Sequence, residues 1–142
     1  MSTGPEDVSD ETAAGTDQGV DDTALRREVD DLVGRWLTLP EAAEVLDVDL
    51  TRVRGLLDDG ALVAVRRGRP RVLSVPAVMV EPEPLPGLKG TMTLLADSGY
   101  DELEALRWLF QPHESLAGDP PVARMRIGQR GEIRRLAQAL AF

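Results

Sequence analysis

The chain contains no cysteine, a single histidine, and few aromatic residues, which make up 4% of its 142 residues. Without cysteine there can be no disulfide, no thiolate metal site and no cysteine nucleophile. The lone histidine, His113, lies in a proline-flanked loop beside Glu114, and we interpret it as a surface residue. No histidine pair, phosphate-binding glycine loop or serine nucleophile motif is present. We therefore expect a protein that is not an enzyme and uses no cofactor or metal.

Long apolar runs are also absent. No stretch approaches the roughly 18 apolar residues that a membrane-spanning helix needs. The first ten residues have neither the basic start nor the apolar stretch of a signal peptide. We expect a cytoplasmic protein with no membrane partner.

Acidic residues are in excess, with a net charge of −9, but the charge is unevenly distributed. Residues 1–31 hold ten carboxylates against two arginines, a net charge of −8. Residues 51–71 hold six arginines against two aspartates, a net charge of +4. Salt screens charges beyond about 8–10 Å, so a nucleic acid responds to the local charge of the face it meets. The acidic total therefore does not exclude DNA as a partner.

The first 21 residues predict an acidic, disordered tail. Large apolar residues in this segment are limited to Val8 and Val20, too few to offset the entropy cost of ordering it. A helical spacing of apolar residues begins after Asp22, which could cap the helix, and Gly34 could end it.

Two short helices joined by a tight turn are predicted next. Residues 38–41, Thr-Leu-Pro-Glu, form a capping box with proline in the first turn, where it is tolerated. Asp49 could cap the second helix, over about residues 50–59, and Gly60 could close it. This arrangement, with arginines on the outer face of the second helix, is typical of a helix-turn-helix.

A β-hairpin is predicted over about residues 62–75. The β-prone runs 62–65 and 72–75 flank a loop that contains Gly68 and several arginines. A hairpin directly after the second helix is the wing of a winged helix-turn-helix. The predicted fold class is therefore mainly α with a small β-hairpin wing, and residues 22–80 are the predicted DNA-binding domain.

Residues 81–142 predict a helical C-terminal region packed on that domain. A proline-rich joint over residues 81–87 precedes it. Predicted helices cover about residues 88–98, a segment from the Asp101 capping box to Pro112, and about residues 129–141, with a loop over 112–122.

The candidate DNA-contacting residues lie on the second helix and on the wing. In a helix-turn-helix, the second helix enters the major groove, where an arginine can bond both O6 and N7 of guanine. The wing arginines are suited to phosphates and to the minor groove, and we expect no nearby acidic residue to neutralise them. The candidates are Thr51, Arg52 and Arg54 on the helix, and Arg66, Arg67, Arg69 and Arg71 on the wing.

Other interpretations remain open for these arginines. Those on the helix could be ordinary solvated charges, and those on the wing could form a solubilising loop or bind RNA or an acidic protein. The C-terminal arginines predict a solvated helix face: Arg124, Arg126, Arg130, Arg134 and Arg135.

Segments of the second half carry a family resemblance. These are Leu85–Leu88 (LPGL), Asp97–Tyr100 (DSGY), Arg107–Phe110 (RWLF) and the ending Arg134–Phe142. With them, residues 36–142 resemble a family of small actinobacterial DNA-binding proteins that pair a winged helix-turn-helix with a helical C-terminal domain. The resemblance implies DNA binding through the candidate residues above and control by a Ser/Thr protein kinase.

Threonines among the acidic residues are candidate phosphorylation sites: Thr3, Thr12, Thr16 and Thr23. Each phosphate would add about −1.5 to −2 charges. We hypothesise that a tail charged in this way competes with DNA for the wing arginines.

The leading interpretation is a non-catalytic protein of the nucleoid that binds double-stranded DNA, as a transcriptional regulator or a nucleoid-associated factor. No heptad pattern is long enough for a coiled-coil dimer, which favours a monomer. Two alternatives remain: a protein-interaction module on a winged-helix scaffold, and an excisionase-like factor that bends DNA.

Overall fold

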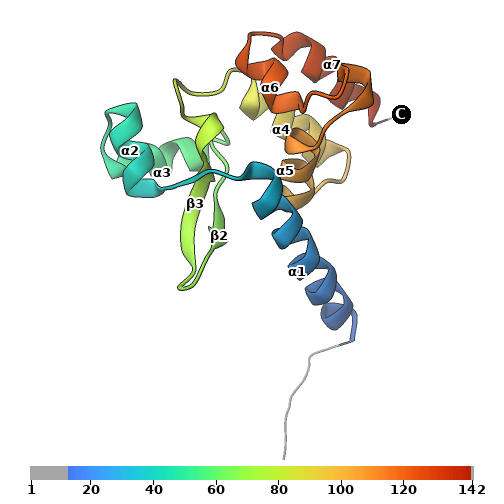
Figure 1. Cartoon of the computed structure of the whole chain (residues 1–142), viewed down its shortest axis with the longest axis horizontal. Helices are drawn as coiled ribbons and strands as arrows, with labels where there is room; N and C mark the ends of the chain where they lie inside the picture. The colour runs from blue at the N-terminus through green and yellow to red at the C-terminus, as the bar shows by residue number, and fades with distance from the viewer. Residues whose placement is uncertain (1–12, 142) are drawn as a thin grey trace, which may run out of the picture.

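The computed structural model describes residues 13–141, with side chains from Asp22 onward. The first part contains α1 (Ala13–Val33), β1 (Trp36–Thr38), α2 (Leu39–Leu46), α3 (Leu50–Asp58), β2 (Val65–Arg67) and β3 (Val72–Pro76). The second part contains η1 (Ala77–Met79), α4 (Leu88–Asp97), α5 (Glu102–Phe110), η2 (Glu114–Leu116), α6 (Pro121–Arg126) and α7 (Arg130–Ala139). In Figure 1, α1 and the β2–β3 hairpin project from one side of the molecule, away from α6 and α7. The predicted fold class, mainly α with a small β wing, is confirmed.

The hairpin belongs to a three-stranded antiparallel sheet with strand order β1-β3-β2. Leu37 of β1 pairs with Val75 of β3, and Arg66 of β2 pairs with Leu73 on the other side of β3. Strand β1 was not predicted. Its three residues are too few to show an alternating pattern, and its partner lies far along the chain.

The first wing strand lies later in the chain than the prediction of residues 62–65. Leu62 and Val63 are only 2% and 4% exposed and pack into the core before the strand begins. Successive residues of a strand face opposite sides, so two adjacent core residues are better accommodated by irregular backbone. The strand therefore includes Arg66 and Arg67, which the sequence had placed in the loop.

Local hydrogen bonds explain where several helices begin. At α2, the Glu41 amide donates to Thr38 Oγ1 over 3.3 Å, and the Thr38 amide donates to Glu41 Oε1 over 2.8 Å. Asp101 and Glu104 form the same reciprocal pair at the start of α5. These side chains satisfy amides that have no partner within the helix. Both predicted capping boxes are confirmed.

Helix α1 begins at Ala13, nine residues before the start predicted at Asp22. The glycines and low apolar content of residues 13–21 favoured an irregular segment. Once a helix is nucleated, however, each added residue gains a backbone hydrogen bond at little further cost. Residues 13–21 of the predicted tail are therefore helical in the structure, and residues 1–12 lie outside the described part of the chain.

The C-terminal helices α4, α5 and α7 lie close to their predicted positions. The predicted loop over residues 112–122 is wrong in two places, because η2 occupies residues 114–116 and α6 begins at Pro121. Proline suits the first turn of a helix, where its missing amide costs no hydrogen bond. The prediction placed Pro120 and Pro121 in the loop, although Pro121 is the first residue of α6.

One apolar core connects both parts of the chain. Val29 of α1 is 1% exposed, and α1 packs against α5, whose Leu106 and Leu109 are fully buried. The Arg107 Nη1 of α5 also donates to Glu28 Oε1 of α1 over 3.4 Å. Helix α1 is therefore held by the C-terminal helices while its neighbouring strands build the sheet.

Candidate nucleic-acid interface

Helix α3 presents polar side chains on the side that faces away from the core. The Asp49 carboxylate caps it, accepting from the Arg52 amide over 2.8 Å, and the fully buried Val53 anchors it. The side chains of Thr51, Arg52 and Arg54 are exposed. Within the described residues, neither arginine side chain has a carboxylate partner. The N-terminal half of α3 thus offers two free guanidinium groups to solvent.

The wing, residues 65–76, carries further exposed arginines. Arg66 lies on β2, and Arg69 and Arg71 lie in the turn before β3. Gly68 adopts a φ of +85°, which opens the turn and is strained for residues with a Cβ. As far as the structure describes the chain, these three arginines form no ion pair. The wing is a projecting hairpin with three unneutralised positive charges.

Arg67 differs from the other wing arginines. Its Nε donates to Asp30 Oδ1 of α1, and its guanidinium lies 5.1 Å from the ring centroid of Trp36. The hydrogen bond to Asp30 raises the pKa of Arg67 above its ordinary value, partly opposed by burial. The expectation that no acid lies near the four wing arginines is therefore wrong for Arg67. Asp30 precedes it by 37 residues, so no local pattern could have indicated the pair.

A cleft of about 730 Å³ separates α1 from the wing. Arg26 and Arg27 of α1 line one wall, and Arg66, Arg69 and Arg71 line the other. Sequence reasoning missed Arg26 and Arg27, because they were counted only as a small offset to the surrounding carboxylates. Two adjacent arginines within an acidic helix were the available signal.

The four candidate phosphorylation sites fall in different places. Thr3 and Thr12 lie outside the described residues, and Thr16 lies on α1 at a position whose side chain is not described. Thr23 is exposed on α1 and lines the cleft between α1 and the wing. Of the four, Thr23 is the one whose surroundings are defined, and it lies next to the arginines.

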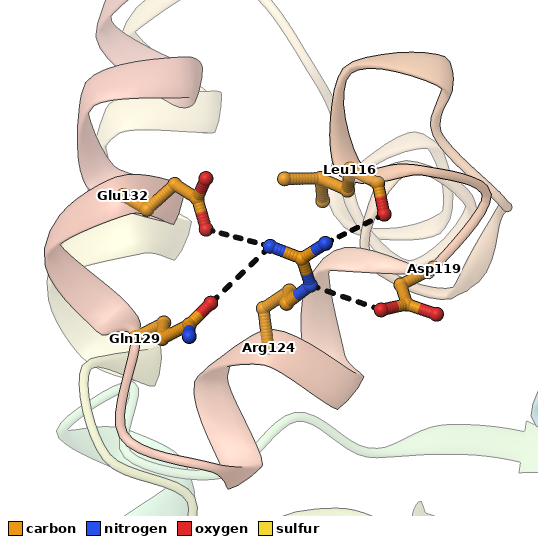
Figure 2. Close-up of polar contacts among 5 residues, drawn as sticks. All are labelled: Leu116, Asp119, Arg124, Gln129 and Glu132. Carbon is orange, nitrogen blue, oxygen red and sulfur yellow. Dashed lines mark hydrogen bonds and ion pairs between the residues drawn. The ribbon is translucent and has the colours of Figure 1, made fainter.

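The prediction that all five C-terminal arginines form a solvated helix face is wrong for Arg124 and Arg126. Arg124 joins η2, α6 and α7, and its side chain is 20% exposed (Figure 2). It donates to Leu116 O over 2.8 Å, Asp119 Oδ2 over 2.9 Å, Glu132 Oε1 over 3.0 Å and Gln129 Oε1 over 3.2 Å. The carboxylates raise its pKa, the Asp119 hydrogen bond most of all. All three nitrogens of its guanidinium group therefore donate hydrogen bonds within the fold.

Arg126 and His113 are structural as well. Arg126 Nη2 donates to the carbonyl of Val78, joining α6 to the end of the sheet region, and burial lowers the pKa of this guanidinium. His113 was predicted to be a surface residue, but it is half-buried, with its ring 6.1 Å from that of Trp108 in an edge-on arrangement. By contrast, Arg130, Arg134 and Arg135 are exposed, as predicted for a solvated helix face.

Over residues 13–141, no helix is both long and apolar enough to cross a membrane. Among the side chains described from Asp22 onward, no three histidines or carboxylates gather in a way that could hold a metal ion.

Comparisons with known proteins cover both parts of the chain. Residues 24–80 match the family model described as DNA-binding protein Rv2175c, wHTH domain, and residues 85–141 match the Rv2175c C-terminal domain of unknown function. The DNA-binding protein Rv2175c of Mycobacterium tuberculosis is 35% identical over 115 residues, covering 73% of this chain and 79% of the relative. The NMR structure of Rv2175c superposes with a TM-score of 0.67 at 34% identity, covering 76% of this chain and 82% of that one.

Proposed function

Because this chain belongs to the Rv2175c family, we propose that it binds double-stranded DNA through α3 and the wing. The observation that carries this proposal is a set of exposed arginines without a carboxylate partner in the described chain: Arg52, Arg54, Arg66, Arg69 and Arg71. Guanidinium groups that the protein leaves unpaired are available to phosphates and to base edges.

Helix α3 would enter the major groove and supply base contacts. Arg52 and Arg54 lie in its N-terminal half, the part of a recognition helix that meets base edges. A bidentate arginine contact to guanine contributes about 1–3 kcal/mol of discrimination against a wrong base. Asp58 and Asp59 lie at the opposite end of the helix, where their charge is kept from the groove.

The wing would contact the adjacent backbone and minor groove. Arg66, Arg69 and Arg71 are within reach of a groove that α3 does not occupy, because the hairpin projects beyond the body of the molecule (Figure 1). Arg67 has a different part in this proposal. Its bonds to Asp30 and Trp36 hold the hairpin against α1, so that the other three arginines are presented together.

The proposed biological role is that of a non-catalytic regulator of transcription or a nucleoid-associated factor. Such a role requires binding whose electrostatic part is strong and whose sequence preference resides in a few side chains. The proposed interface meets this requirement, since the arginines that would contact bases lie on α3 and those that would contact the backbone lie on the wing.

A salt series tests the proposal. Duplex affinity of the full chain would be measured from about 50 to 200 mM salt, and roughly five phosphate contacts should give a slope of log K against log salt of about −4 to −5. Arg66→Ala, Arg69→Ala and Arg71→Ala together should flatten the slope. Arg52→Ala with Arg54→Ala should also weaken the preference for a selected site over mixed sequence.

The matched control is Arg134→Ala with Arg135→Ala, which removes two exposed arginines from α7, far from the wing. It should bind DNA like the unchanged protein. Weak binding that is insensitive to salt would contradict the proposal and favour a protein-interaction module instead.

A further inference from the structure

We propose that α1 is part of the DNA interface, and that the cleft between α1 and the wing holds the second phosphate backbone of the minor groove that the wing enters. This inference rests on the proposed function, and extends the contact surface to a helix outside the helix-turn-helix and the wing.

The cleft between α1 and the wing is strongly basic. Its walls bring together six arginines and a single carboxylate, Asp30, among the side chains that line it. Asp30 forms an ion pair with Arg67, and Arg26 forms an exposed ion pair with Asp22 at 3.6 Å. Within the described part of the chain, this leaves Arg27, Arg66, Arg69 and Arg71 without an acidic partner. Unpaired charges of one sign around one cleft are stabilised by an anion.

The acidic side chains of α1 that the structure describes, from Asp22 onward, do not cancel this charge, because each is paired with an arginine or lies outside the lining of the cleft. Glu28 pairs with Arg107 on α5, on the opposite side of the helix from the cleft. Asp31 is exposed and does not line the cleft. An overall acidic helix therefore presents a basic side to the wing.

The dimensions of the DNA minor groove indicate that a sugar-phosphate backbone would occupy the cleft. The minor groove is about 6 Å wide, so a hairpin that enters it has one sugar-phosphate backbone on each flank. In Figure 1 the wing lies between α3 and α1. The α1 cleft therefore lies on one flank of the wing, and α3 lies on the other. When α3 occupies the major groove, one backbone runs between α3 and the wing, and the other runs into the cleft.

Two hydrogen bonds link the walls of the cleft. Arg26 Nη1 donates to the carbonyl of Arg66 over 3.5 Å, and Arg67 Nε donates to Asp30 Oδ1. These two contacts fix the distance between α1 and the base of the wing. The remaining arginines surround the space with donors that point to no protein acceptor in the described chain.

The experiment compares the full chain with Arg26→Ala/Arg27→Ala. Each lost phosphate contact reduces the salt slope by about 0.9, so the double variant should flatten it by about 1, because Arg27 is unpaired whereas Arg26 is already paired with Asp22. Preference for a selected site over mixed sequence should stay unchanged, because a backbone contact reads no bases. Arg134→Ala/Arg135→Ala makes the same change in net charge and should leave the slope unaltered. Circular dichroism melts of all variants check that α1 remains folded.

A second measurement locates the contact. Single methylphosphonates, which remove one phosphate charge, would be placed in turn along both strands of a bound duplex. Substitution on one strand beside the wing-filled minor groove should weaken binding of the unchanged protein but have little effect on Arg26→Ala/Arg27→Ala. Equal sensitivity of both proteins at every phosphate would overturn the inference.

The outcomes separate this inference from the proposed function. If the wing variants flatten the salt slope while Arg26→Ala/Arg27→Ala matches the unchanged protein, the wing binds DNA without α1 and only the inference fails. If the unchanged protein shows no salt-dependent binding to duplex DNA, the proposed function fails, and the inference fails with it.

Discussion

The free arginines of the winged part differ from Arg124 and Arg126 of the C-terminal helices in what their guanidinium groups contact. Arg52, Arg54 and Arg66 are exposed and have no acidic partner in the described chain, whereas Arg124 and Arg126 donate to carbonyls and carboxylates of their own fold. A guanidinium has five donors, which must be satisfied by protein, water or ligand. The difference shows that the number of arginines in a segment overstates how many are available to a ligand, because the fold uses some of them.

The exception within the winged part supports the same conclusion. Arg67 stands between exposed arginines in the sequence, yet it is bound to Asp30 and lies over Trp36. In the proposed interface, this arginine would position its neighbours on the hairpin and would not itself contact DNA.

The largest effect should come from removing free guanidinium groups from α3. Arg52→Ala combined with Arg54→Ala should lower affinity for a selected duplex by about a hundredfold or more, since each base contact contributes about 1–3 kcal/mol. The melting temperature should not change, because both side chains are exposed. Fluorescence anisotropy titration and thermal melts would measure the two quantities. An equal loss in Arg134→Ala/Arg135→Ala would erase the contrast between the two parts of the molecule.

The converse change is Arg126→Ala in the C-terminal helices. It should lower the free energy of unfolding by about 1–2 kcal/mol, because it removes a charged hydrogen bond to the Val78 carbonyl. Duplex affinity should be unchanged. Urea denaturation measures the stability, with Arg134→Ala as the exposed control. If both variants unfold at the same urea concentration, Arg126 is not the structural arginine described above.

Arg67 provides the intermediate case. Arg67→Ala should destabilise the fold by about 1 kcal/mol, since it removes a half-exposed ion pair and a cation–π contact. It should also weaken DNA binding by releasing the wing from α1. A double-mutant cycle with Asp30→Ala isolates the coupling, and Arg67→Lys retains the charge without the planar group. Full duplex affinity in Asp30→Ala would show that the pair does not position the wing.

The smallest expected effect is on the free energy of unfolding, through the capping box at the start of α2. Backbone and side-chain hydrogen bonds with Thr38, aided by the charge of Arg35, hold the pKa of Glu41 below its ordinary value of 4.5. The carboxylate therefore stabilises the fold above about pH 4.5, and this contribution is lost as pH falls through the lower pKa of the folded state. The stability difference between the unchanged protein and Glu41→Gln should shrink on acidification, measured as urea midpoints across an acid pH series. Glu44→Gln is the control on the same helix, and a pH-independent difference for Glu41→Gln would contradict the prediction.

Features that depend on neighbours in sequence were predictable. The Thr38–Glu41 and Asp101–Glu104 boxes and the Asp49 cap are each complete within four residues, and the structure contains all three. The hairpin was placed correctly in outline, because β-prone runs and a glycine turn follow one another directly. The same local patterns gave the exposed arginines of α3.

Features that depend on distant partners were not. Strand β1 exists because β3 pairs with it, and the ion pair of Arg67 requires Asp30 on another helix. Arg124 was interpreted as a solvated residue because Leu116, Asp119 and Glu132 surround it only after three short elements pack together. The cleft beside α1 likewise appears only when the helix and the wing are folded next to each other.

Helix α1 has a consequence for how the protein can be divided. Glu28 and Asp30 are about 200° apart around the helix, and they bind Arg107 of α5 and Arg67 of the wing, respectively. The two family models meet near residue 80, but this helix is bonded on both sides of that boundary. A fragment that ends at residue 80 would leave the apolar side of α1 in water and Glu28 without Arg107. The winged part matches a family model of its own, but its first helix, α1, needs α5 of the C-terminal part to bury its apolar side and to pair with Glu28.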